Sequence, residues 1–214
     1  MLTAYYTIKK EASKQNIIQK SRFIGYVSRA ETEEAAQNFI QQINKKNPDA
    51  NHNCSAYIIG EQDHIQKAND NGEPSGTAGV PILEVLKKQK LKDTVIVVTR
   101  YFGGIKLGAG GLIRAYGGAA SGVIKAAGVV ERQLMQGMMI TVDYGLLGKL
   151  ENAFRTSEHV LSNIDYSDQV VFHMYVKIAD TQDFKNWVVD MTSDQVVIED
   201  KNHAYIEMQV GPDP

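Results

Sequence analysis

The sequence predicts an α+β protein of two domains, the second with a ferredoxin-like βαββαβ order. Apolar residues alternate between the period of a strand and the period of a helix, and charge is divided unevenly along the chain. Residues 1–136 hold 18 Lys and Arg against 12 Asp and Glu, a charge of +6, whereas residues 137–214 hold 5 against 13, a charge of −8. We therefore expect one domain over 1–136 and a second over 137–214.

Composition places the chain among soluble globular proteins. Of its 214 residues, 43% are hydrophobic and 22% charged, and no apolar run approaches the length of a membrane span. Residues 1–6 lack a basic region followed by an apolar core, and the single cysteine, Cys54, can form no internal disulfide. We expect a cytoplasmic protein without a membrane contact; its oligomeric state is not determined by the sequence.

Local signals locate the elements of the first domain. Thr32 is the expected N-cap of an amphipathic helix that Asn47 and Pro48 stop, and Pro81 suits the first turn of a second helix. The β-branched run 95–98 predicts a buried strand. The expected strands are 5–8, 16–18, 23–27, 54–59 and 93–99, and the expected helices are 31–46, 81–90 and one ending near 127.

A polar loop over 68–79 precedes the second helix. Because it has little apolar area to bury, we expect it to be mobile or to be ordered by a ligand. Its candidate motif residues are Asp70, Gly72, Glu73, Pro74, Ser75, Gly76 and Thr77.

The second domain follows the split βαβ order, which hosts many functions and so indicates no particular chemistry. A last strand is expected to turn as a hairpin around Lys201, Asn202 and His203 before residues 204–210 extend the sheet. The other expected elements are strands at 138–144, 160–166 and 170–178 and helices over 146–154 and 184–191.

The densest signal lies between residues 100 and 116, where a strand ends, a glycine-rich loop turns and a helix of small residues begins. Glycines expose backbone N–H groups, and cations beside a helix N-terminus make an anion site. A purely turn-forming role for these glycines is the alternative. Tyr101, Phe102 and Tyr116 are candidates for stacking on unpaired bases. The alternative is that Phe102 lies in the core and Tyr116 packs on the helix face. The candidate anion or nucleic-acid contacts are Arg22, Arg100, Gly103, Gly104, Lys106, Gly108, Gly110, Gly111 and Arg114.

Two long stretches resemble motifs of the YigZ/IMPACT family, namely residues 69–79 (NDNGEPSGTAG) and residues 100–108 (RYFGGIKLG). Residues 21–24 and 52–57 resemble earlier motifs of that family. The family's usual loop has two consecutive acids before its glycine, whereas here Asn71 follows Asp70, which argues against a role that needs paired carboxylates.

The resemblance implies a fold and a role. It implies a two-layer α/β first domain like the second domain of a small-subunit ribosomal protein, and a second domain like the last domain of elongation factor G. It also implies translation regulation, since the eukaryotic relative competes for the activator of a stress-responsive initiation-factor kinase.

We interpret the chain as a non-enzymatic, translation-linked regulatory protein. It would bind RNA, the ribosome or a translation-associated protein through the basic, glycine-rich face of its first domain, with a logarithmic salt slope of about −3 if four phosphates are neutralised. The alternative is a hydrolase or small-ligand binder for a phosphorylated or peptide substrate, with residues 70–77 as a lid and His52 and Cys54 on one strand face. No catalytic residue, metal or cofactor is assigned, since no motif or ligand spacing indicates one.

Overall fold

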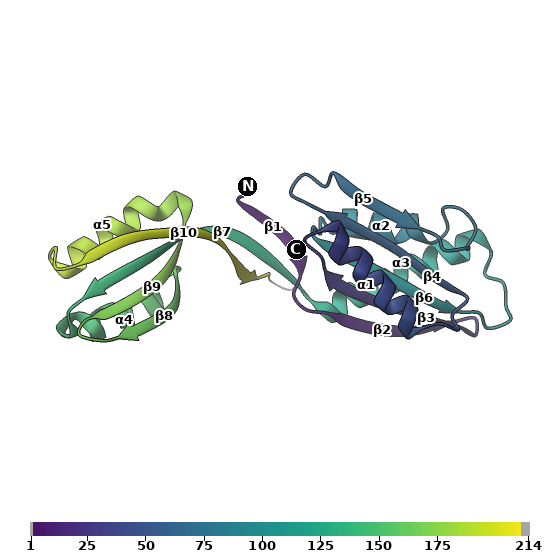
Figure 1. Ribbon diagram of the computed structural model, residues 1–214, viewed down its shortest axis with the longest axis horizontal. Helices are drawn as coiled ribbons and strands as arrows, with labels where there is room; N and C mark the ends of the chain where they lie inside the picture. The colour runs from purple at the N-terminus through teal and green to yellow at the C-terminus, as the bar shows by residue number, and fades with distance from the viewer. Residues whose placement is uncertain (1, 211–214) are drawn as a thin grey trace. The chain divides into compact units, whose positions relative to one another are not determined.

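The structure, a computed structural model, describes residues 2–210 (Figure 1). The chain folds into two compact units: unit 1 runs to Glu131 and also holds Gln209 and Val210, and unit 2 is Arg132–Met208. Both units mix helices with strands, so the predicted two-domain α+β class is confirmed. Residue 1 and residues 211–214, which the expected domains include, lie outside the described residues.

Unit 1 is built on a five-stranded antiparallel sheet. Its elements are β1 (Ala4–Ile8), β2 (Ala12–Ile18), β3 (Ser21–Arg29), α1 (Glu33–Lys46), β4 (His52–Ile59), β5 (Ile65–Asn69), α2 (Gly79–Lys88), β6 (Thr94–Tyr101) and α3 (Gly108–Ala127). The strand order of the sheet is β2-β3-β6-β4-β5. β7 (Val129–Val142) begins in this unit and continues into unit 2.

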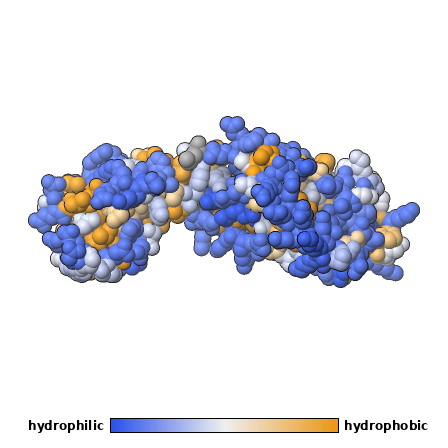
Figure 2. Space-filling model, in the orientation of Figure 1, coloured by the Kyte–Doolittle hydropathy of each residue, from blue (hydrophilic) through white to orange (hydrophobic). Residues whose placement is uncertain are grey.

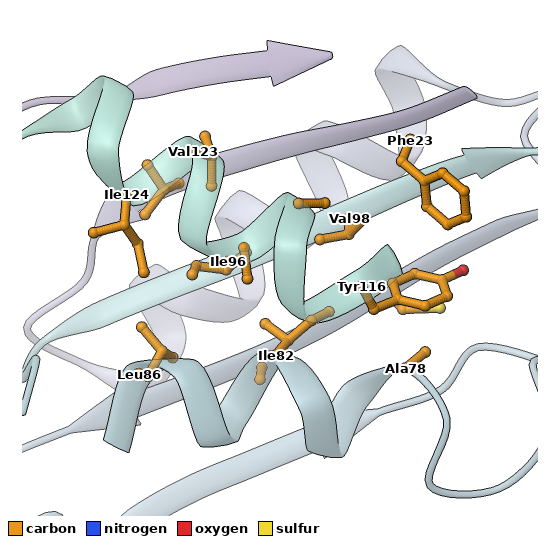
Figure 3. Packing of buried hydrophobic residues seen from close by; sticks show 14 of the residues in the cluster. Phe23, Ala78, Ile82, Leu86, Ile96, Val98, Tyr116, Val123 and Ile124 are labelled. Atoms are coloured by element: carbon orange, nitrogen blue, oxygen red, sulfur yellow. The ribbon is translucent and has the colours of Figure 1, made fainter. Parts of the chain in front are cut away.

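Helices cover both faces of this sheet. Along β6, Val95 and Val97 pack toward α1, whereas Ile96 and Val98 pack toward α2 and α3, and all four are fully buried. Successive side chains of a strand point to opposite faces, so a β-branched run without polar positions needs a cover on each side. Figure 3 shows Ile96 and Val98 near Ile82 of α2. The unit therefore has three layers, one more than the two expected.

Most elements of unit 1 lie where local signals place them. The Thr32 side chain accepts the amide of Ala35 at 3.1 Å and caps α1 as predicted. β5 was not expected, and it pairs with β4 at the edge of the sheet. Its side chains are half-buried or exposed, so the sequence lacks the alternation of apolar and polar residues that marks a strand.

Unit 2 has the ferredoxin-like topology. After β7 its elements are η1 (Tyr144–Leu146), α4 (Leu147–Thr156), β8 (Val160–Tyr166), β9 (Val170–Lys177), η2 (Ile178–Asp180), α5 (Thr181–Thr192) and β10 (Val197–Gln209). The order β10-β7-β9-β8 sets the unit's first strand between its last and its third, as the split βαβ arrangement requires. The core packs sheet residues such as Ile140 and Phe172 against Leu150, Phe154 and Phe184 of the helices.

The expected hairpin around residues 201–203 is wrong. Lys201, Asn202 and His203 lie inside β10, which is one continuous strand. A Cβ on Gly137 of β7 would lie 2.9 Å from the Asn202 carbonyl oxygen, so this glycine lets β10 pass close to β7. Pairing with β7 keeps the polar triplet extended where local composition favours a turn.

Candidate nucleic-acid interface

Four connections of unit 1 meet at one end of its sheet. They join β2 to β3, α1 to β4, β5 to α2 and β6 to α3 (Figure 1). The amide of Gly103, in the last of these, donates to Ser21 Oγ at 3.2 Å. The amide of Phe102 donates to Asn51 Oδ1 at 2.7 Å, which ties the same connection to the one between α1 and β4. The segments that carry the candidate residues therefore support one another.

The loop between β5 and α2 is ordered by its own hydrogen bonds. The Asp70 carboxylate accepts the amide of Gly76 at 2.8 Å and the amides of Ala78 and Gly79 at 3.0 and 2.8 Å. Ala78 is the N-cap of α2 and has no side-chain acceptor, so Asp70 supplies one. Burial by itself would raise the pKa of Asp70, but the three amide donors outweigh it and hold the pKa below its ordinary value. The expectation of a mobile or ligand-ordered loop is wrong, because the motif contains its own capping group.

A buried ion pair joins the two long motifs. Glu73 Oε1 accepts from Arg100 Nη1 at 2.7 Å and from the Tyr116 hydroxyl at 2.6 Å. The side chains of Glu73 and Arg100 are 3% and 6% exposed. The guanidinium also lies over the ring of Phe102, with its Cζ 5.4 Å from the ring centroid. The charge of Arg100 is thus neutralised inside the unit, and the phosphate contact expected of this residue is not available.

Cys54 and His52 are held by the backbone of the same loop. Cys54 Sγ donates to the Asp70 carbonyl oxygen at 3.0 Å. Burial raises the pKa of the thiol to about 12, so the group is protonated at neutral pH and is a poor nucleophile. His52 Nδ1 lies 2.9 Å from the carbonyl oxygen of Asn71. Both side chains therefore fasten β4 to the first motif.

The rest of the first motif shapes the turn. Gly72 and Gly76 have φ values of +86° and +76°, which glycine adopts without strain. Thr77 is buried, and its Oγ1 donates to the Pro74 carbonyl oxygen at 2.6 Å. Pro74 and Ser75 are exposed. This part of the motif thus presents only small side chains to solvent.

The second motif turns directly into α3. A Cβ on Gly103 would lie 2.0 Å from the carbonyl carbon and oxygen of Lys20, so only glycine fits beside the β2–β3 turn. Gly110 and Gly111 belong to the start of α3, which no side chain caps, and not to a loop as expected. Two further glycines adopt positive φ, namely Gly104 and Gly108. The glycines therefore serve the turn, and the helix N-terminus faces solvent without a side-chain acceptor.

Arg22 lies apart from the other candidate cations. Its neighbour Phe23 packs toward α3, with the ring in edge contact with Tyr116, so Arg22 points to the opposite face of the sheet. There its Cζ sits 4.1 Å above the ring centroid of Tyr101. Arg22 therefore lies on the face of the sheet opposite α3, which carries Arg114.

Three exposed cations remain near the β6–α3 connection, namely Lys20, Lys106 and Arg114. Lys20 was missed from the sequence. It occupies the β2–β3 turn with φ +64° beside Gly103, and the polar pair of residues between two apolar strands was the signal that marks such a turn.

Exposed apolar side chains accompany these cations. Phe102, Ile105 and Ile113 are 45%, 41% and 45% exposed. Figure 2 shows hydrophobic residues among hydrophilic ones at the tip of unit 1, where the β6–α3 connection ends in Figure 1. Tyr116 is fully buried, so it cannot stack on a base as one alternative had it. The expectation of a core position for Phe102 is wrong, because its ring is exposed and covers Arg100 from outside.

Residues 2–210 contain neither a metal-binding cluster of side chains nor a membrane-spanning helix. No three His, Cys, Asp or Glu side chains in that range are grouped so as to hold a metal ion. No helix of the described chain has both the length and the apolar character needed to cross a bilayer.

Comparison with known proteins identifies the family. The family model of the Impact N-terminal domain matches residues 19–124, which include both long motifs, and a domain of unknown function, DUF1949, matches residues 140–195. A Bacillus subtilis (strain 168) protein, IMPACT family member YvyE, is 55% identical over 211 residues, which are 99% of this chain and 97% of the relative. The chain belongs to the IMPACT family.

Other similarities extend over both units of this IMPACT family protein. IMPACT family member YigZ of Escherichia coli (strain K12) is 32% identical over 177 residues, covering 82% of this chain and 87% of its own length. A crystal structure described as that of a hypothetical protein is 27% identical with a TM-score of 0.61, covering 92% of this chain and 97% of that one. The resemblance of the two motifs to the YigZ/IMPACT family is therefore confirmed.

Proposed function

We propose that this IMPACT family protein is a non-catalytic, translation-linked module that binds single-stranded RNA through one end of unit 1. The surface concerned, here called the basic end, consists of Lys20, Phe102, Lys106 and Arg114. The observation that carries the proposal is that three exposed cations and an exposed ring lie on the β2–β3 turn, the β6–α3 connection and the first two turns of α3, whose N-terminus no side chain caps.

Each part of the basic end has a chemical counterpart in a nucleic-acid strand. Lys106 and Arg114 stand beside the free amides at the start of α3, and cations together with helix N-terminal amides favour phosphate. The ring of Phe102, 45% exposed, offers a face on which an unpaired base can stack. The acids of the first motif repel phosphate only weakly, because the Glu73 carboxylate is paired with Arg100 and the Asp70 carboxylate accepts backbone amides.

The translation link follows from family membership and from the role that the motif resemblance implies. RNA is favoured over an acidic protein surface because stacking and phosphate contacts together account for both the ring and the cations. Ribosomal RNA is one form that such a strand takes, so binding to the ribosome belongs to the same proposal.

Salt dependence of binding tests the proposal. Fluorescence anisotropy with a labelled oligouridylate should give a logarithmic salt slope of about −2, since three phosphate contacts contribute about −0.7 each. Replacing Lys106 and Arg114 together by alanine should bring the slope to about −0.7. Phe102→Ala should weaken binding by about 1–3 kcal/mol without changing the slope.

Arg22→Ala is the matched control, because it removes an exposed arginine from the other face of the sheet. It should leave the slope unchanged. A slope near zero, or one that the Lys106 and Arg114 substitutions do not alter, would show that the basic end does not bind phosphate. A partner that co-purifies from cell extract and survives RNase would indicate a protein ligand in place of RNA.

A further inference from the structure

A second basic feature of unit 1 lies at the far end of α3. A groove of about 870 Å³ runs between the C-terminal ends of α2 and α3, beside β1. We call it the lysine groove and define it by Tyr6, Val85, Lys88, Lys90, Ile124 and Lys125. α3 has 20 residues, so at 1.5 Å per residue the groove lies roughly 25–30 Å from the basic end. The two surfaces are therefore separate.

The lysine groove combines an apolar floor with a cationic rim. Tyr6, Val85 and Val129, all half-buried, supply the floor, and Ile124 also lines it but is only 1% exposed. Lys88, Lys90 and Lys125 are exposed at the rim, and none of the groove's lining residues is acidic. No acid among residues 2–210 forms an ion pair with these three lysines, whereas neighbouring Lys87 pairs with Glu84 at 3.4 Å.

Backbone acceptors complete the groove. The last turn of a helix leaves carbonyl groups without intrahelical donors, and α2 and α3 both end here. In α2 the amides of Gln89, Leu91 and Lys90 satisfy the carbonyls of Val85, Leu86 and Lys87, and in α3 the amide of Gly128 satisfies that of Ile124. Among residues 2–210, the carbonyls of Lys88 and of residues 125–127 have no backbone donor and can accept from a ligand. Because helix C-termini carry partial negative charge, they suit N–H donors and disfavour a chain of phosphates.

We propose that the lysine groove binds an extended acidic peptide segment of a partner protein. The peptide's apolar side chains lie on the floor at Tyr6 and Val85, and its carboxylates reach the rim lysines. Its backbone N–H groups face the carbonyls of Lys88 and of residues 125–127. Alternate side chains of an extended peptide point in opposite directions, which matches an apolar floor below a charged rim. This proposal does not depend on RNA binding at the basic end.

Peptide binding by the full chain tests the proposal. A short fluorescein-labelled peptide that alternates glutamate with leucine should bind saturably, and its glutamine counterpart should bind more weakly. Replacing Lys88 and Lys125 together by glutamate should weaken the acidic peptide about tenfold or more, because two attractive pairs become repulsive. Lys87→Glu, on the same helix but outside the groove, should change the affinity less than about twofold.

Three outcomes would overturn the proposal. If Lys88 and Lys125 only stabilise the helix C-termini, their replacement by glutamate lowers the thermal stability and leaves the peptide affinity unchanged. An equal loss with Lys87→Glu would show that the peptide responds to overall charge. If the Lys106 and Arg114 alanine variant loses the peptide, or oligouridylate displaces it, the peptide sits on the basic end. If the unaltered protein binds the acidic peptide but does not bind oligouridylate, only the proposed function is contradicted.

Discussion

Glu73→Gln removes one charge from the buried pair between the two motifs and leaves the size of the side chain nearly unchanged. The Arg100 guanidinium, 6% exposed, then keeps a long hydrogen bond to Ser21 Oγ at 3.4 Å and no carboxylate, and its Nε already has no hydrogen-bond acceptor. Removing one partner of a buried ion pair costs about 3–5 kcal/mol because the other charge stays buried without compensation. We expect unit 1 to lose stability by that amount.

Guanidinium denaturation measures this loss. Two compact units can unfold in separate steps, so the unit 1 step must be distinguished from that of unit 2. Trp187 is the single tryptophan and lies in unit 2, so its fluorescence follows that unit. Far-ultraviolet circular dichroism follows the unfolding of both units. A circular dichroism transition at a denaturant concentration where the fluorescence does not change therefore reports on unit 1.

Two comparisons decide whether burial of the pair is the cause. Glu84→Gln removes an acid from the exposed pair with Lys87 in the same unit and should cost no more than about 1 kcal/mol. Joining Arg100→Met to Glu73→Gln removes both charges and should restore part of the loss. The reasoning is refuted if Glu73→Gln costs no more than Glu84→Gln, or if the double variant is less stable than Glu73→Gln alone.

Three further predictions concern the stability of unit 1. Asp70 has a lower pKa folded than unfolded, so its stabilisation is present above its ordinary value of 3.8 and is lost as pH falls through the folded pKa. Asp70→Asn should therefore lower the free energy of unfolding by about 1–2 kcal/mol at neutral pH, and by less in acid denaturation series below about pH 4. Gly103→Ala should cost about 1–3 kcal/mol because its Cβ meets the Lys20 backbone at 2.0 Å. Gly118 is exposed on α3 and has no atom within 4 Å of a new Cβ, so Gly118→Ala should instead stabilise unit 1 by about 0.5–1 kcal/mol. A change of the melting temperature in the same direction for both glycine variants would contradict this expectation.

The exposed residues of the candidate site were the most predictable part of it. Lys106 and Arg114 lie at the solvent-facing start of α3, where glycines beside cations indicated an exposed helix N-terminus. Arg100 looked equivalent in the sequence, but its carboxylate partner is 27 residues away. No local sequence pattern predicts the pairing of Glu73 with Arg100, because the two residues meet only through the tertiary fold. Whether an arginine is exposed depends on which loop packs against it.

Local patterns alone determined the elements that depend on near neighbours. The Thr32 cap involves an amide three residues on, and the strand and helix periods of unit 2 specified its βαββαβ order. Tertiary structure decided what depends on segments distant in the chain: the third layer of unit 1, the uninterrupted course of β10 past Gly137, and the role of Asp70 as the acceptor for α2. Hydrophobic periodicity predicts which face of an element is buried. Which segment covers that face is decided only in the assembled sheet, because pairing between distant segments leaves no local pattern in the sequence.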